Sequence, residues 1–137
     1  MTSHEADPDA TVRALFAHLS AREFDEMALL LAEDVEFDLA YAPEFLPMPT
    51  RGRGAVRDLV GNVIGGMFEP FVITVTTTYL GATPGLVVAE YASDGVVKHN
   101  GKQYLNRYVG IFRVDGDGLI ASWREYHNPE AATQALA

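Results

Sequence analysis

The chain contains no cysteine, and this absence removes several kinds of chemistry. Without thiols the protein can form no disulfide, supply no thiolate nucleophile and bind no cysteine-ligated zinc. A stable fold must therefore come from ordinary apolar packing. A chain of 137 residues, of which 48% are hydrophobic, is long enough to bury a sufficient core in one domain.

Long apolar runs and positive charge are also scarce. No run approaches the roughly 18 apolar residues that a membrane-spanning helix needs, and the polar start MTSHEADPDA is unlike a signal peptide. We therefore expect a soluble, cytoplasmic protein with no membrane partner. Ten basic residues stand against 19 acidic ones, which gives a net charge of −9. Such a surface repels phosphate backbones, so nucleic acid is not expected as a partner.

Recognisable motifs for metals and cofactors are missing as well. The DGDG segment is too short for a calcium loop, and the chain has no glycine-rich phosphate loop or nucleophile-elbow serine. The four histidines lack the spacing of metal ligands: His4, His18, His99 and His127. The sequence thus predicts a protein that works without a metal or cofactor.

Three helices are predicted in the first half of the chain. Asp7 followed by Pro8 is a typical helix start. A second, short helix is expected from Phe24 to Leu31, and a third from Gly54 to about Gly65. The first helix has an apolar stripe at helical spacing, made of Val12, Leu15, Phe16 and Leu19.

Strands dominate the second half. The predicted strands cover residues 35–40, 72–80, 86–91, 104–114 and 119–127. Helices grouped early and strands grouped late favour an α+β fold, in which helices cover the concave face of a curled antiparallel sheet and leave a pocket between them. We expect one domain over residues 1–137, with loosely ordered ends at 1–7 and 130–137.

The stretch YLNRYVGIFRVDGDGLIASWREYHNP resembles a known family. It is similar to the SnoaL-like branch of the nuclear transport factor 2-like superfamily, above all to the phenazine-biosynthesis A/B proteins. The residues that carry this resemblance are Tyr104, Asn106, Gly118, Ile120, Arg124, Glu125, Tyr126 and Asn128. The resemblance implies a cone-shaped α+β barrel, a homodimer formed through the outer face of the sheet near residues 72–78, and a small organic ligand.

Glu125 is the first candidate for catalysis. The two-residue period of a strand puts Trp123, Glu125 and His127 on one face. In the phenazine-pathway relatives the matching glutamate is a catalytic acid, and a carboxyl beside Trp123 would lose solvation and gain a raised pKa. His127 is a candidate proton-exchange partner. The alternatives are a surface glutamate paired with a cation and an exposed strand-end histidine.

Residues that could hold a substrate lie on the preceding strand and the first helix. Tyr104, Asn106 and Tyr108 alternate on one face, which fits either a polar pocket wall or a solvent-facing sheet. His18 could reach the pocket rim, and Arg51 and Arg53 could meet an anionic group at the mouth, although all three also fit exposed positions. Apolar walls are expected from Trp123, Phe112 and Phe16.

Asp38 aligns with the general base of ketosteroid isomerases, but the rest of that apparatus is absent. Leu15 and Gly110 stand where those enzymes have their oxyanion-hole tyrosine and protonated aspartate, and Asn128 replaces the last aspartate of limonene-type epoxide hydrolases. Phe37 and its alternating neighbours are better candidates for burial than Asp38. Neither of those two reactions is therefore inherited by resemblance.

The sequence leads to one functional hypothesis with two alternatives. We expect a cofactor-independent acid/base enzyme of small-molecule or secondary metabolism, an isomerase, cyclase or condensation catalyst of the ketosteroid isomerase-like or polyketide cyclase-like kind. Glu125 would be its acid/base, with His127 or Asp38 as partner. The first alternative is a non-catalytic ligand-binding or interaction domain on the same fold. The second is a scaffold whose pocket is filled by aromatic side chains.

Overall fold

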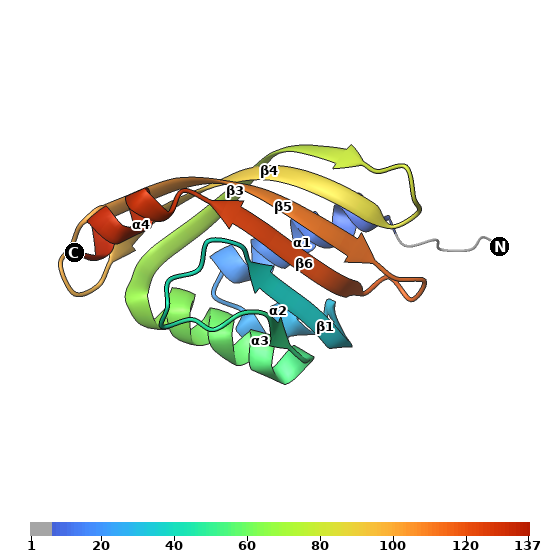
Figure 1. The fold of residues 1–137 in the computed structure, drawn as a ribbon, viewed down its shortest axis with the longest axis horizontal. Coiled ribbons are helices and arrows are strands. Elements are labelled where there is room, and N and C mark those ends of the chain that lie inside the picture. Colours follow the sequence, from blue (N-terminus) through green and yellow to red (C-terminus); the bar gives the residue numbers. More distant parts are fainter. Residues whose placement is uncertain (1–6) are drawn as a thin grey trace.

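The computed structural model describes residues 7–137 and contains a curved sheet wrapped around helices (Figure 1). The six strands are ordered β2-β1-β6-β5-β4-β3. The elements are α1 (Pro8–Ser20), α2 (Phe24–Ala28), β1 (Leu31–Leu39), β2 (Thr50–Arg51), α3 (Arg53–Val60), the π-helical turn η1 (Gly61–Gly65), β3 (Phe68–Leu80), β4 (Leu86–Val97), β5 (Gln103–Val114), β6 (Ile120–His127) and α4 (Pro129–Leu136). The predicted α+β class is confirmed, while most of the expected amino-terminal tail lies outside the described residues.

Helices α1, α2 and α3 lie beneath the concave face of the sheet (Figure 1). α1 begins as predicted, because the Asp7 carboxylate accepts hydrogen bonds from the backbone N–H groups of Asp9 and Ala10 at 3.1 and 3.4 Å. All four residues of its apolar stripe are buried. α2 is shorter than predicted, since Leu31 has left the helix to begin β1, where it is fully buried and paired with Ile120.

The sheet is antiparallel except for one pair. β1 runs parallel to β6, and every other neighbouring pair of strands is antiparallel. β4 continues to Val97 instead of ending at Tyr91. The polar segment that suggested a loop is paired on both sides, with Asp94 opposite Val72 of β3 and Leu105 of β5. Ladder hydrogen bonds from two neighbours thus outweigh the low strand propensity of this segment.

The carboxyl-terminal segment forms a helix, which corrects the expectation of a loose tail. The Asn128 side chain caps α4 by accepting a hydrogen bond from the Glu130 N–H at 3.0 Å. At the other end, Asn100 Nδ2 donates to the Ala135 carbonyl at 2.8 Å, and the Ala135 side chain is buried. A short alanine-rich helix is marginal alone, so these tertiary contacts account for its order.

Across residues 7–137, no helix combines the length and the apolar character that a membrane span requires.

Candidate active site

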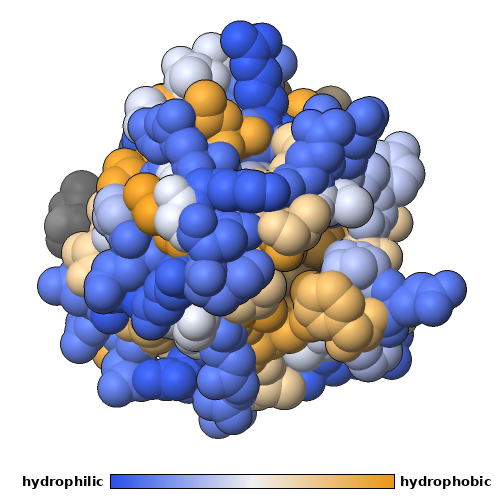
Figure 2. Space-filling model, turned by 90° about the vertical axis from the view of Figure 1, so that its left-hand side faces the viewer, coloured by the Kyte–Doolittle hydropathy of each residue, from blue (hydrophilic) through white to orange (hydrophobic). Residues whose placement is uncertain are grey.

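A cavity of about 140 Å³ lies between the concave face of the sheet and the helices. The cavity extends to the end of the molecule that carries α4, where Ala132 and Leu136 of α4 and Phe45 of the loop before β2 contribute to its wall. Figure 2 faces this end and shows apolar residues gathered around a hollow, with hydrophilic residues outside them. The cavity is open, so the alternative of a pocket filled by aromatic side chains is wrong.

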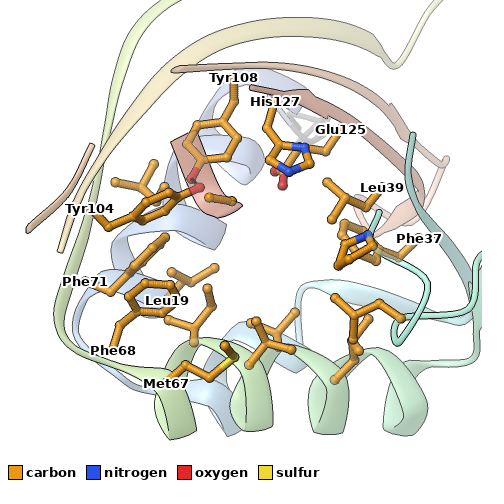
Figure 3. A pocket seen from close by; sticks show the side chains of 18 of the residues that line it. Leu19, Phe37, Leu39, Met67, Phe68, Phe71, Tyr104, Tyr108, Glu125 and His127 are labelled. Atoms are coloured by element: carbon orange, nitrogen blue, oxygen red, sulfur yellow. Dashed lines mark hydrogen bonds between the residues drawn. The ribbon is translucent and has the colours of Figure 1, made fainter. Parts of the chain in front are cut away.

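The polar residues that line this cavity all come from two neighbouring strands. Tyr104 and Tyr108 project from β5, and Trp123, Glu125 and His127 project from β6, while the remaining lining residues are apolar. Figure 3 shows Tyr108, His127 and Glu125 on one side of the cavity, with Met67 and Phe68 on the opposite side. The predicted face of β6 is therefore the pocket face.

Glu125 has one hydrogen-bond partner in the site. The Tyr91 hydroxyl on β4 donates to Glu125 Oε1. Gly110 lies between the two strands, opposite both Ala89 and Glu125. A Cβ atom at Gly110 would stand 2.7 Å from the Tyr91 hydroxyl, closer than real Cβ atoms come. The glycine thus makes room for the contact between Tyr91 and Glu125.

The environment of Glu125 favours its neutral form. Although the residue is half-buried, its carboxyl group is surrounded by protein, and this burial raises its pKa from 4.5 to about 7. The Tyr91 hydrogen bond opposes the rise. The Trp123 indole N–H also lowers the pKa of Glu125, although the contact between the indole and the carboxyl group does not meet the geometry of a full hydrogen bond. Tyr91 remains a donor, because burial and the nearby Glu125 raise its own pKa.

His127 is the second titratable group on this wall. Burial lowers its pKa, which keeps the imidazole neutral near pH 7. Its ring stacks on Tyr108, with centroids 6.4 Å apart and planes 13° apart. Its Nδ1 atom is buried and has no hydrogen-bond partner in the protein. A neutral imidazole with a free nitrogen is able to accept or donate a proton.

The tyrosine hydroxyls form a short network. The Tyr108 and Ser93 hydroxyls are 2.8 Å apart, and the Tyr108 and Tyr104 hydroxyls are 3.2 Å apart. Burial raises the pKa of both tyrosines, so both stay protonated. Tyr104 also packs flat against Phe68, with ring centroids 5.2 Å apart. These residues give part of the wall hydrogen-bonding capacity without charge.

Asn106 does not line the cavity, contrary to the sequence expectation. Its Nδ2 donates to the Tyr104 hydroxyl at 2.6 Å and to the Asn128 carbonyl at 2.9 Å. Its Oδ1 accepts from the Arg107 and Asn128 N–H groups at 2.8 and 3.1 Å. An amide has two donors and roughly two acceptor sites, so Asn106 has nothing left for a substrate. Its role is to hold β5 to the junction between β6 and α4.

Asp38 and His18 also lie outside the cavity. Phe37 and Leu39 are the residues of β1 that line it, and Asp38 alternates to the opposite face beside exposed Arg124. His18 Nδ1 is 2.8 Å from Glu23 Oε1, and its side chain is about one-third exposed. The two-residue period excludes Asp38, and the contact with Glu23 holds His18 away from the pocket.

The remaining predicted residues lie on the cavity wall, in the core or outside both. Phe16 and Trp123 line the cavity as expected, whereas Phe112 is fully buried in the core between them and does not line it. Arg51 is exposed and pairs with Glu36 at 3.2 Å. Arg53 donates to the Leu31 carbonyl at 2.9 Å. Neither arginine lines the cavity.

Tyr91 belongs to the candidate site through its hydrogen bond to Glu125, and the sequence did not predict it. It lies on β4 in an inward-facing row with Val87, Ala89 and Ser93, all of them buried. The alternation of these residues was a usable signal for the inner face. This alternation could not predict the partner of the Tyr91 hydroxyl, because Glu125 is 34 positions further along the chain.

Within residues 7–137, no three His, Asp or Glu side chains gather closely enough to hold a metal ion.

Comparison with known proteins identifies relatives over most of the chain. A family model for the SnoaL-like domain matches residues 12–123. The uncharacterized protein YesE of Bacillus subtilis (strain 168) is 28% identical over 126 residues, which are 92% of this chain and 84% of YesE. A solved structure from Bacillus subtilis, provisionally named an isomerase, has a TM-score of 0.85 at 27% identity and covers 93% of this chain and 90% of that one.

A more distant structure was solved with a bound small molecule. RV0760c of Mycobacterium tuberculosis, in complex with estradiol-17β-hemisuccinate, has a TM-score of 0.78 at 19% identity, covering 89% of this chain and 94% of that one. At this identity the likeness shows the fold alone.

Proposed function

We propose, on the premise that the chain belongs to the SnoaL-like domain family, that it is a cofactor-independent acid/base enzyme. Its substrate class would be small, cyclic and partly apolar organic molecules. The reaction would be a proton transfer at a carbon next to a carbonyl group. Isomerisation, cyclisation and condensation can all begin with that step, and the shared fold by itself selects none of them.

One observation carries the proposal: Glu125 presents a carboxyl group with a pKa of about 7 to an otherwise largely apolar cavity. A group whose pKa is near the working pH is present in both protonation states and can therefore remove a proton and return it. The surrounding apolar wall strengthens its electrostatic effect on a bound molecule, because few waters compete for it.

His127 would be the partner of Glu125 in this reaction. It lies two residues further along β6 on the same face, and Figure 3 shows both side chains directed into the cavity. As a neutral imidazole with a free nitrogen, it can take a proton while Glu125 gives one, or the reverse. Tyr91 would act as a positioning residue, because its hydroxyl holds one oxygen of Glu125.

The Glu125→Gln variant tests the proposal. Cyclohexanone in D₂O serves as the probe, and the rate at which deuterium enters its ring positions next to the carbonyl measures proton transfer. We expect wild-type protein to accelerate this exchange and Glu125→Gln to lose about 100-fold or more of the acceleration. The matched control is Asp38→Asn, which neutralises a carboxylate on the opposite face of β1. Equal exchange in wild type and Glu125→Gln would remove Glu125 from the mechanism.

The alternative is a non-catalytic ligand-binding domain. It is favoured by the hydrogen bond from Tyr91, which already occupies one oxygen of Glu125, and by the outward direction of Asp38. This reading predicts that cyclohexanone binds with the same affinity from pH 5 to 8 and exchanges no deuterium. An affinity that changes across pH 7 favours the enzyme.

The protein is also proposed to be a homodimer that pairs through the outer face of its sheet. This face carries exposed apolar residues on neighbouring strands, among them Val72, Leu105 and Val109.

A further inference from the structure

Three hydroxyl groups meet on the inner face of the sheet, and they carry more protons than the protein accepts. The Ser93 and Tyr108 hydroxyls are 2.8 Å apart, and the Tyr108 and Tyr104 hydroxyls are 3.2 Å apart. Each of these two contacts uses one hydroxyl proton, although the three groups have three. No other atom of residues 7–137 accepts a hydrogen bond from them. One hydroxyl proton is therefore left without an acceptor.

Asn106 fixes the direction of this network at one end. Its Oδ1 accepts from the Arg107 and Asn128 backbone N–H groups, which can only donate, so the amide cannot be turned round. Its Nδ2 is therefore the donor to the Tyr104 hydroxyl oxygen, at 2.6 Å. The proton of Tyr104 itself is not used in this bond.

Ser93 fixes the direction at the other end. It is 3% exposed and does not line the cavity, so a proton that it failed to donate to Tyr108 would be buried without an acceptor. Because such a donor is costly, Ser93 donates to Tyr108. The unused proton then belongs to Tyr104 or Tyr108. Both residues line the cavity, and Figure 3 shows their side chains converging at the hydroxyl ends.

Of these two phenols, Tyr104 is the better donor to a ligand. Burial raises its pKa, but hydrogen bonds from Tyr108 and Asn106 oppose the rise. Burial and the neighbouring Tyr104 both raise the pKa of Tyr108. A hydroxyl whose oxygen accepts hydrogen bonds is also polarised and donates more strongly. The donors therefore run from Ser93 to Tyr108 to Tyr104, and the unused proton is that of Tyr104.

The cavity limits which acceptor can meet this proton. Its volume of about 140 Å³ is close to that of an apolar cavity of about 150 Å³ that holds one benzene ring. No lysine or arginine of the described residues lines it, and burial keeps His127 neutral near pH 7. An anionic acceptor would therefore be buried without a counter-charge, which is unfavourable. The remaining class is an uncharged oxygen on a molecule of about one ring.

We propose that the Tyr104 hydroxyl is the hydrogen-bond donor that the cavity offers to its ligand, and that this ligand is an uncharged single-ring compound with a carbonyl oxygen. Ser93, Tyr108 and Asn106 supply the hydrogen bonds that leave the Tyr104 proton unused. This inference rests on the proposed function only in assuming that a small organic molecule occupies the cavity.

Cyclohexanone labelled with ¹³C at its carbonyl carbon tests the proposal, because a donor to the carbonyl oxygen moves this resonance downfield. The titration is done at about pH 8.5, where most Glu125 is ionised and cannot donate, whereas burial keeps Tyr104 protonated. We expect the resonance of the bound ketone to lie downfield of its position in hexane with wild-type protein. With Tyr104→Phe it should move back towards the hexane position.

Tyr108→Phe is the matched control, since Asn106 still donates to Tyr104 in this variant and the Tyr104 proton stays unused. The bound resonance should therefore remain downfield. A bound resonance at the hexane position with wild-type protein overturns the proposal. So does a resonance that stays downfield in Tyr104→Phe, which would assign the donor to Tyr108 or His127.

Binding affinity gives a second readout. Loss of one hydrogen bond in Tyr104→Phe should weaken cyclohexanone about 3- to 10-fold more than methylenecyclohexane, in which a CH₂ group replaces the oxygen. An equal loss for both probes reduces Tyr104 to an apolar wall. Should Tyr104→Phe fail to fold, wild-type protein labelled with ¹³Cζ-tyrosine decides. The Tyr104 resonance should then move with cyclohexanone only, and an equal response to both probes overturns the proposal.

The outcomes separate this inference from the proposed function. Deuterium exchange that is lost in Glu125→Gln, together with a bound resonance unchanged by Tyr104→Phe, leaves the enzyme proposal standing and overturns the role of Tyr104. A downfield resonance that depends on Tyr104, without any deuterium exchange, supports the role of Tyr104 and removes the catalytic proposal. If cyclohexanone does not bind, both fall.

Discussion

At the scale of single residues, the carboxyl group of Glu125 is poorly solvated, and few hydrogen bonds replace the water that it has lost. Burial raises its pKa, and one hydrogen bond from Tyr91 offsets only part of that rise. The ionised form is therefore less stable in the folded protein than in the unfolded chain. A carboxyl placed for structural purposes would more commonly be paired with a cation. The surroundings of Glu125 therefore keep part of its carboxyl groups neutral near pH 7.

The same burial predicts how stability depends on pH. Between pH 4.5 and 7 the folded protein holds a proton on Glu125 that the unfolded chain has already lost, so the contribution of this group to stability falls as the pH rises through that window. The loss of stability is complete above pH 7 and is on the order of 3 kcal/mol. We expect Glu125→Gln to be more stable than wild type at pH 8 and close to it at pH 4.5, as measured by urea unfolding.

The Tyr91→Phe variant gives the opposite result and serves as the matched comparison. Its missing hydroxyl leaves ionised Glu125 without a donor, so its stability should fall more steeply with pH than that of wild type. If wild type and Glu125→Gln show parallel stability curves from pH 4.5 to 8, the carboxyl group does not have the raised pKa described above.

At the scale of elements, β6 supplies the cavity wall that carries Glu125 and His127, and it leads directly into α4, which adds Ala132 and Leu136 to the wall. Its inward residues end at His127, and the next residue, Asn128, begins the cap of α4. Asn106 of β5 holds this junction through both backbone groups of Asn128. The position of His127 therefore depends on an amide that touches no ligand.

Two variants separate these contributions to the junction. Asn106→Ala leaves both Asn128 backbone groups without their partner and removes one of the two partners of the Tyr104 hydroxyl, which should lower the free energy of unfolding by about 2–3 kcal/mol. Asn128→Ala removes only the helix cap and should cost about 1 kcal/mol. Urea unfolding measures both, and Thr133→Ala on the exposed side of α4 is the control.

Hydrogen exchange shows whether these losses reach α4. The amides of α4 should exchange faster in Asn106→Ala than in wild type, because the helix is marginal without its attachment. An equal loss of stability in the two variants would contradict the separate roles given to Asn106 and Asn128.

At the scale of the whole molecule, the two faces of the sheet differ. The inner face forms the core and the cavity, while the outer face carries apolar side chains in solvent. Val72, Leu105 and Val109 are 44%, 57% and 38% exposed. Val72 and Leu105 both lie opposite Asp94, so they belong to one row across three strands. Exposed apolar residues on neighbouring strands favour a protein interface.

The proposed homodimer can be tested on this face. Val109→Glu places a charge at an exposed apolar position on the outer face of β5 and should convert a dimer into a monomer in sedimentation velocity. Leu29→Glu is the control, because Leu29 is 67% exposed at the end of α2 and does not lie on β3, β4 or β5. A wild-type protein that sediments as a monomer would contradict the proposal, as would a dimer unaffected by Val109→Glu.

The sequence by itself determined the elements and the orientation of their faces, because these depend on local periodicity. The apolar stripe of α1 and the shared face of Trp123, Glu125 and His127 follow from residues a few positions apart. The family resemblance at residues 104–129 added the identity of the fold.

Only the tertiary structure decided which inward-facing residues line the cavity and which are packed in the core. Tyr108 lines the cavity and Phe112 does not, although both lie on the inner face of β5. The hydrogen bond from Tyr91 to Glu125 and the full set of partners around Asn106 depend on strand register. The length of β4 depends on its pairing with β3 and β5, and the formation of α4 depends on its contact with Asn100. These features arise from contacts between segments far apart in the chain, and a local pattern carries no information about a distant partner.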